Sequence, residues 1–174
     1  MHRENLKTID YRREFGLETV KMWRLSFQRA LGLQEHNRWD ELSDQLAYFQ
    51  DLDPALSRIT VDVRTTQVVG LLTLSGEKLD HLFVHVDYQR AGIGKTLLDE
   101  AKARSPAGLT LYTFQRNVGA QQFYLSQGFV ETERGFASFD GNPWAQSKSD
   151  LAHIRYEWRP ELIPLAAGVS GCIG

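Results

Sequence analysis

The sequence predicts an α/β protein with a central, twisted mixed sheet, in which most strands are antiparallel and helices flank the sheet. Two observations support this prediction. Apolar residues recur at helical spacing in two early segments, 13–31 and 37–50. From residue 58 onward the period changes to that of strands. These strands are first joined by tight turns and then alternate with helices, which is typical of a parallel strand–helix–strand segment.

Each predicted element follows from its local pattern. The run 58–64 alternates apolar and polar residues, as a half-buried strand does. Turn residues occupy 65–67 and 75–78, so the first strands should form hairpins. The predicted strands are 58–64, 68–74, 81–86, 109–114, 129–133 and 154–158, and the stretch 5–11 is compatible with an earlier one. The predicted helices are 13–31, 37–50, 95–104 and 117–127.

The third of these strand runs decides which side chains could reach a site. Alternation puts Leu82, Val84 and Val86 on one face, and the odd-numbered residues, including His81 and His85, on the other. The unit from 81 to 114 should be a parallel crossover.

Composition limits the function classes. The 174 residues suit one domain, expected over 1–160, followed by an apolar tail at 161–174 without periodicity. Lys and Arg number 20 against 22 Asp and Glu, so the net charge of −2 does not favour nucleic-acid binding. The single cysteine, Cys172, excludes an intrachain disulfide and a cysteine-based zinc site, and no metal is expected. Without an apolar leader or membrane-spanning run, we expect a cytoplasmic protein with no membrane partner, and a homodimer is possible.

The strongest chemical signal is the loop 89–96, Gln-Arg-Ala-Gly-Ile-Gly-Lys-Thr, which leaves a strand and opens a helix. Such a loop points backbone N–H groups and the positive end of the helix dipole at an anion. The P-loop pattern fails because its first glycine would fall at Gln89, and the dinucleotide fingerprint fails because its third glycine would fall at Leu97. The pattern Gln/Arg-x-x-Gly-x-Gly/Ala fits residues 89–94 at every defined position.

A second segment, 117–129, carries Asn, Ala, Phe-Tyr and Gly-Phe in that order, one strand further along. With both segments, the chain resembles the Gcn5-related N-acetyltransferase (GNAT) family over about residues 57 to 158. The resemblance implies an acyltransferase that moves an acetyl group from acetyl-coenzyme A to a primary amine by direct attack in a ternary complex. A small-molecule amine is the first expectation. A peptide or protein acceptor, or an acyl-coenzyme A sensor without turnover, is the alternative.

The resemblance also implies which residues hold the cosubstrate. The expected contacts are Val84, His85, Val86, Gln89, Arg90, Ala91, Gly92, Ile93, Gly94, Lys95, Thr96 and Asn117. The strand carrying Val84 and Val86 would pair its backbone with the pantetheine arm, and a backbone N–H near Val84 would hold the oxyanion. Many relatives have proline where Val86 stands, and valine offers an N–H that proline lacks.

For catalysis, the resemblance places Tyr124 at the general-acid position and makes Asp80 the best aligned general base. Each residue also has a plainer interpretation. Tyr124 could be a core aromatic, Asp80 a turn residue that caps a strand, and Asn117 a helix N-cap. His81 and His85 titrate in a more useful range but could face away from the cleft, and a water chain could also serve as base.

The acceptor side is less well marked. Acidic residues gather between 35 and 53 and could attract a cationic amine, although a solvated helix face is the favoured explanation. Trp39, Tyr48 and Trp144 could line an acceptor pocket, and aromatic residues at helical spacing, as at Trp39, usually belong to a core.

Overall fold

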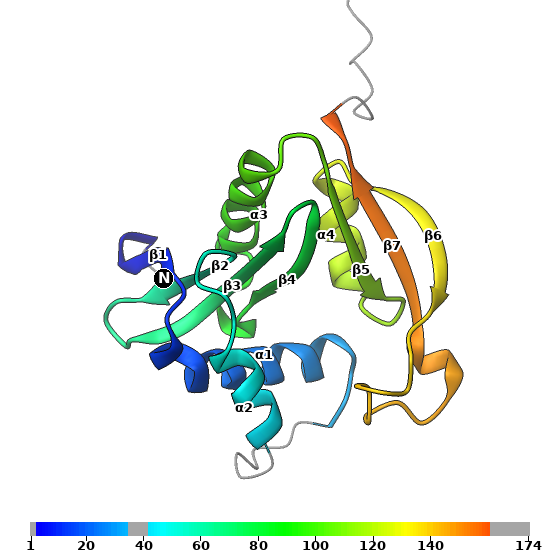
Figure 1. The fold of residues 1–174 in the computed structure, drawn as a ribbon, viewed down its shortest axis with the longest axis horizontal. Coiled ribbons are helices and arrows are strands. Elements are labelled where there is room, and N and C mark those ends of the chain that lie inside the picture. Colours follow the sequence, from blue (N-terminus) through cyan, green and yellow to red (C-terminus); the bar gives the residue numbers. More distant parts are fainter. Residues whose placement is uncertain (1–2, 35–41, 161–174) are drawn as a thin grey trace, which may run out of the picture.

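The computed structural model describes residues 3–34 and 42–160, and these form one seven-stranded sheet flanked by helices (Figure 1). The strand order is β1-β2-β3-β4-β5-β7-β6, and every neighbouring pair is antiparallel except β4 and β5. The strands are β1 (Leu6–Asp10), β2 (Ser57–Asp62), β3 (Gln67–Ser75), β4 (Lys78–Val84), β5 (Leu109–Phe114), β6 (Val130–Phe136) and β7 (Ala152–Trp158). The predicted mixed sheet with one parallel pair is confirmed.

Helices cover both faces of the sheet and divide its core in two. They are α1 (Gly16–Ala30), α2 (Ser43–Gln50), α3 (Ile93–Arg104) and α4 (Val118–Ser126). One core packs α3 and α4 against the sheet through residues such as Leu72, Leu97 and Tyr124. The other packs α1 and α2 against the opposite face through residues such as Phe49 and Leu71.

The predicted elements are present, with shifted ends. β4 begins at Lys78, not at residue 81, because Ser75 already pairs with Lys78 and the connecting turn is only two residues long. Val86 lies outside the strand, in a short 3-10 turn (Val86–Tyr88). The second helix begins at Ser43, and the part of its predicted range from 37 to 41 lies outside the described residues, as does the tail at 161–174.

The parallel strands β4 and β5 pair over a very short length. β4 and β5 share one register position, Lys78 opposite Thr110, where the Thr110 N–H donates to the Glu77 carbonyl over 2.8 Å. Beyond that point the strands diverge toward their C-terminal ends (Figure 1). β5 is fully paired on its other side with β7, from Leu109 to Phe114. The sheet therefore opens between β4 and β5, just before the chain enters the glycine-containing loop.

Gly70 sets how closely α3 approaches the sheet. A Cβ at this position of β3 would lie 2.9 Å from a methyl group of Ile93 and 3.1 Å from one of Leu97. Only glycine therefore lets the first turn of α3, which follows the loop, pack directly onto the strand. The backbone of one strand thus fixes the height of the loop above the sheet.

Gly70→Ala should therefore lower the free energy of unfolding by about 1–3 kcal/mol, as overpacking of a tight core does. The measurement is urea denaturation monitored by circular dichroism. Gly119→Ala is the matched control, since a Cβ on that helical glycine meets only the Asn117 side chain, at 3.9 Å. The control should leave stability unchanged or slightly higher. Equal stability of the two variants would contradict the packing argument.

Candidate functional site

The loop between β4 and α3 has the backbone geometry of an anion site. Arg90 and Gly92 both have positive φ, 65° and 86°, so the chain turns sharply before Ile93 starts the helix. The first intrahelical bond runs from the Thr96 N–H to the Gly92 carbonyl over 3.0 Å. The backbone N–H groups of the first helical turn before Thr96 consequently have no partner within the helix. They converge at the positive end of the helix dipole, which favours a phosphate group.

The side chains of this loop divide into two groups. Ile93 is buried in the core below α3, so it can offer a ligand only its backbone. Lys95 is exposed and paired with Asp99 over 2.6 Å, and the Thr96 hydroxyl donates to the Gly92 carbonyl. Gly94 faces the opening, because a Cβ there would touch Val84 and Phe123 at 3.5 Å. Gly94 therefore lies between the side chains of Val84 and Phe123 at the start of α3.

Beyond Lys78, the edge of β4 that faces β5 carries backbone groups that no strand pairs. The His85 N–H donates to the Val69 carbonyl over 2.9 Å, and Val84 stands opposite Gly70. Because hydrogen bonding alternates along an antiparallel pair, the N–H and C=O of Val84 point away from β3 and into the opening. An extended amide-containing chain could pair with this edge as an added strand, as predicted for the pantetheine arm.

A helix on the opposite face also reaches this edge. The buried Ser26 hydroxyl of α1 donates to the Val84 carbonyl over 3.1 Å, and the Gln89 amide approaches the same oxygen at 3.4 Å. These contacts satisfy a carbonyl that would bond a neighbouring strand if β5 continued alongside. The contact of Ser26 with β4 could not be predicted from the sequence, because it depends on how α1 packs under β4.

His85 is placed differently from the rest of the predicted cosubstrate residues. It is 6% exposed, and its Nδ1 accepts from the Asp87 N–H over 3.2 Å while its Nε2 lies 3.0 Å from the Gln67 amide. The ring lines a cavity of about 220 Å³ between α1 and the start of β3. The His85 side chain therefore lies beneath the sheet, and its backbone is engaged as well, because its N–H donates to Val69 and its carbonyl accepts from the Tyr88 N–H over 2.8 Å.

Tyr124 lies on α4 next to Phe123, whose ring borders Gly94. It is 7% exposed, and its ring contacts Phe129 and Tyr156 with centroids 5.4 and 6.3 Å away. No hydrogen bond joins its hydroxyl to any residue that the structure describes. Burial raises the pKa of the phenol far above its ordinary value, so Tyr124 holds its proton throughout the neutral range.

Asn117 is the N-cap of α4, and its side chain accepts the Ala120 N–H over 3.0 Å. The interpretation of Asn117 as a helix cap is thus confirmed. This cap also fixes the start of the helix that carries Tyr124, so Asn117 acts on the site at least through α4.

Asp80 occupies a bulge in β4. His81 stands opposite Thr73 and Leu79 opposite Leu74, so Asp80 is the extra residue between them. Its carboxylate accepts from the Ser75 hydroxyl over 2.6 Å and pairs with Lys78 over 2.7 Å. Burial alone would raise the pKa of Asp80, but the hydrogen bonds from Lys78 and Ser75 outweigh it and hold the pKa below the ordinary value.

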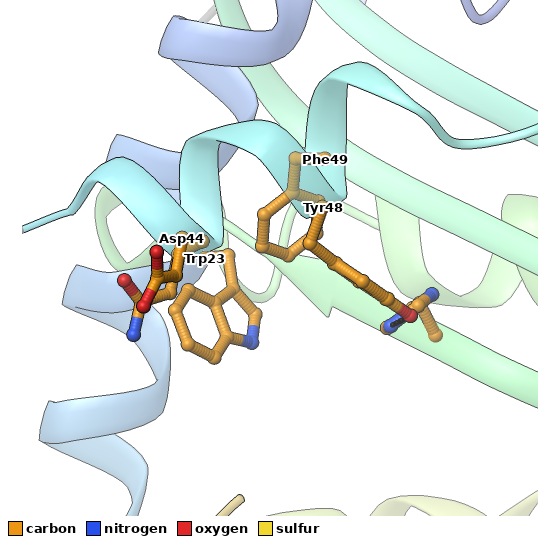
Figure 2. A pocket seen from close by; sticks show the side chains of 6 residues that line it. Trp23, Asp44, Tyr48 and Phe49 are labelled. Atoms are coloured by element: carbon orange, nitrogen blue, oxygen red, sulfur yellow. Dashed lines mark hydrogen bonds between the residues drawn. The ribbon is translucent and has the colours of Figure 1, made fainter.

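The face covered by α1 and α2 carries a second feature, a pocket of about 280 Å³ (Figure 2). Its lining consists of Trp23 from α1, Asp44, Gln45, Tyr48 and Phe49 from α2, and His81 from β4. Tyr48, which the sequence analysis considered for an acceptor pocket, lines this one, and Trp39 lies outside the described residues. Trp23 and Phe49 also pack in the core, since they belong to the apolar stripes of their helices.

Trp144 is not part of this pocket and instead closes the sheet opening from below. It packs edge-on against Phe114, at the end of β5, and against Phe27 of α1, with centroid separations of 5.1 and 5.9 Å. Phe27 in turn stacks on Trp23 at 5.5 Å. An aromatic wall thus joins the pocket to the end of β5, across the face opposite α3 and α4.

Two classes of site find no support in the described parts of the chain. Within residues 3–34 and 42–160, no group of three His, Cys, Asp or Glu side chains could hold a metal ion. No helix in those same ranges is both long and apolar enough to cross a membrane.

Similar proteins share both the sequence pattern and the fold. Relatives in Salmonella typhimurium strain LT2 and Escherichia coli strain K12, both named peptidyl-lysine N-acetyltransferase YjaB, are 30% and 32% identical over 133 residues. These alignments cover 76% of this chain and 89% and 88% of the relatives. The solution structure of apo YjaB from Escherichia coli superposes with a TM-score of 0.68 at 25% identity, covering 88% of this chain and 97% of that one.

A Bacillus anthracis structure described as a streptothricin acetyltransferase, solved with acetyl coenzyme A, is also 25% identical, with a TM-score of 0.50 over 59% of this chain and 62% of its own. The family model for the acetyltransferase (GNAT) domain matches residues 34–144, which contain the glycine loop, the opening between β4 and β5, and Tyr124. The chain therefore belongs to the GNAT family of acetyltransferases, and it is an acyltransferase as its two sequence segments predicted.

Proposed function

We propose that this protein transfers the acetyl group of acetyl-coenzyme A to the ε-amine of a lysine side chain in a peptide or protein. The observation that carries the proposal is the opening between β4 and β5. On one side it is bounded by the α3 N-terminus and α4, and on the other by the aromatic wall that leads to the pocket of Figure 2. The two substrates would enter from opposite faces of the sheet and meet in this opening.

The residues around the opening fit the chemistry of the acetyl donor. The N–H groups at the start of α3 suit its pyrophosphate, and the free edge of β4 at Val84 suits the amides of its pantetheine arm. Gly92 and Gly94 leave the room that a close backbone approach requires. Arg90, Ala91 and Lys95 belong to the same loop, and we assign these three residues to the cosubstrate site together with Gln89, Ile93, Thr96 and Val86.

The pocket supports lysine as the acceptor. Its walls are aromatic at Trp23, Tyr48 and Phe49, which suits a four-carbon stem and a terminal amine. Asp44 stands at its rim and can attract the amine before it loses its proton. The named relatives point the same way, since both are peptidyl-lysine acetyltransferases. This favours the peptide acceptor over the small-molecule amine that the sequence first suggested.

In the reaction, the amine nitrogen forms a bond to the thioester carbonyl carbon, and the carbon–sulfur bond breaks. The Val84 N–H points into the opening and can donate to the oxyanion that develops between these events. The departing thiolate needs a proton, and we assign its donation to Tyr124, whose burial keeps the hydroxyl protonated. The proton lost by the amine goes to a base, for which Asp80 is the candidate that the resemblance supplied.

The acceptor assignment is tested by mass spectrometry of acetylation in a panel of lysine-containing peptides, with free lysine and small diamines measured in parallel. We expect kcat/KM for the best peptide to exceed that for free lysine at least about tenfold, because backbone contacts around the pocket add binding energy. Trp23→Ala should lower kcat/KM for the peptide without changing acetyl-coenzyme A affinity. A preference for a small amine over every peptide would overturn the assignment.

Gly94→Asp should weaken acetyl-coenzyme A binding by at least about 100-fold, because it brings a carboxylate against a polyphosphate. The fold should tolerate the change, since a Cβ at Gly94 meets its neighbours only at ordinary contact distance. Calorimetric titration measures the affinity. Gly76→Asp is the charge-matched control, in a turn with no atom within 4 Å of the new Cβ. If both variants bind as tightly as the wild type, the loop does not hold the pyrophosphate.

Tyr124→Phe should lower kcat by about 100-fold or more, within the range for loss of a general acid, while acetyl-coenzyme A affinity stays within about twofold. Since burial raises the pKa of Tyr124, the wild type should show no loss of activity from its ionisation up to about pH 10. Thiol release with a fixed acceptor peptide gives kcat, and calorimetry gives the affinity. Unchanged turnover in the variant would make Tyr124 a packing residue.

A further inference from the structure

The bulge in β4 turns two consecutive side chains toward the same face. Leu79 and Leu82 both pack in the core under α3 although they are three residues apart, which plain alternation would not allow. The extra residue makes this possible, so Asp80 and His81 lie together on the opposite face, toward α1 and α2. Asp80 bonds Ser75 on that face, and His81 lines the pocket.

The His81 ring is held by aromatic neighbours at the inner end of the pocket. Its centroid lies 5.7 Å from that of Tyr48, 5.9 Å from Phe49 and 6.2 Å from Phe83. Nε2 lies 3.2 Å from the Tyr48 hydroxyl, whereas Nδ1 is fully buried and has no hydrogen-bond partner among the described residues. Only Nε2 is therefore turned toward the pocket.

This environment keeps the imidazole neutral. With its one proton on Nδ1, the neutral ring keeps the Nε2 lone pair toward the Tyr48 hydroxyl. A second proton would place a positive charge among aromatic side chains, which burial disfavours. Burial accordingly lowers the pKa of His81, with Asp80 opposing and Lys78 reinforcing the shift. From α2, the ionisable groups nearby are Tyr48, whose pKa burial raises, and Asp44 at the rim. At neutral pH the ring is a free base.

Asp80 is less suited to take a proton. Both of its oxygens are engaged, by Ser75 and Lys78, and these bonds favour the ionised carboxylate. An efficient general base has a pKa close to the working pH, and a carboxylate held below its ordinary value lies far from that range. Of the two residues that the bulge turns toward α1 and α2, His81 is the better proton acceptor.

We propose that His81 is the general base of the reaction and that Tyr48 positions its ring within the acceptor pocket. This inference rests on the proposed function. As the amine nitrogen bonds to the thioester carbon, the proton it sheds passes to the Nε2 lone pair of His81, directly or through one water, while the thiolate is protonated separately. Tyr48 is 55% exposed, so its hydroxyl can give up Nε2 to the incoming amine at little cost.

The test is the pH dependence of kcat/KM for peptide acetylation in four proteins: the wild type, His81→Gln, Asp80→Asn and Tyr48→Phe. The base is active when neutral, so wild-type activity should fall as pH drops through the lowered pKa of His81, below the ordinary value of 6.5. The kcat/KM of His81→Gln should be about 100-fold lower than that of the wild type at pH 7.5, and its pH profile should lack the decrease toward acidic pH, the acid limb. Asp80→Asn should keep the acid limb and lose less activity than His81→Gln, and Tyr48→Phe should lower kcat/KM modestly and shift the pH of the acid limb.

A second variant guards against a merely structural loss. His81→Ala opens space beside the pocket, and added imidazole should restore part of its activity, which a packing defect would not allow. Acetyl-coenzyme A affinity should be unchanged in all variants. Wild-type rates and an intact acid limb in His81→Gln would overturn the assignment of the base while leaving the proposed function standing. A wild type that binds acetyl-coenzyme A but acetylates no lysine would overturn both.

Discussion

The single register position between β4 and β5 is the constraint on which the site depends. If Lys78 and Thr110 began a continuous parallel ladder, the edge of β4 at Val84 would be consumed by β5 and the sheet would close. The strands part instead, and they leave polar backbone groups facing an opening. Such groups are costly unless satisfied, and the Ser26 hydroxyl meets part of that need at the Val84 carbonyl. The remainder is available to an extended amide-containing ligand.

The elements around the opening are placed by close packing. Gly70 allows α3 to sit directly on β3, which sets the height of the loop from Arg90 to Gly92. Asn117 fixes the start of α4 and with it the position of Tyr124. On the other face, Phe27 and Trp144 pack against the end of β5. Each wall of the opening thus belongs to a different element, and each is held by a contact remote in sequence from the loop.

The parts of the site that could be predicted from the sequence are those governed by local chemistry. A glycine-containing turn before a helix and an asparagine at a helix start carry their backbone geometry in a few residues, so the turn before α3 and the Asn117 cap were predicted with the geometry that the structure has. The sequence also predicted that His81 and Leu82 lie on opposite faces of the strand, but it did not show which face carries a pocket. The pocket of Figure 2 lies on the face of His81, because α2 packs there. Trp23 was hidden for the same reason, since one stripe of α1 serves both core and pocket.

The bulge at Asp80 shows why other features of the site could not be predicted from the sequence. An extra residue in one strand is a property of the register between β3 and β4, and neither strand alone records it. Its effect is large, because it reverses the parity of everything that follows in β4. Before the bulge, an odd-numbered residue, Glu77, turns its carbonyl toward β5. After the bulge, odd-numbered residues such as His85 bond to β3, and the backbone groups of the even-numbered Val84 point toward β5. The same inserted residue therefore turns His81 toward the pocket of Figure 2 and the Val84 backbone toward the opening. In the proposed mechanism, proton removal and oxyanion stabilisation would both depend on this one local feature of the backbone.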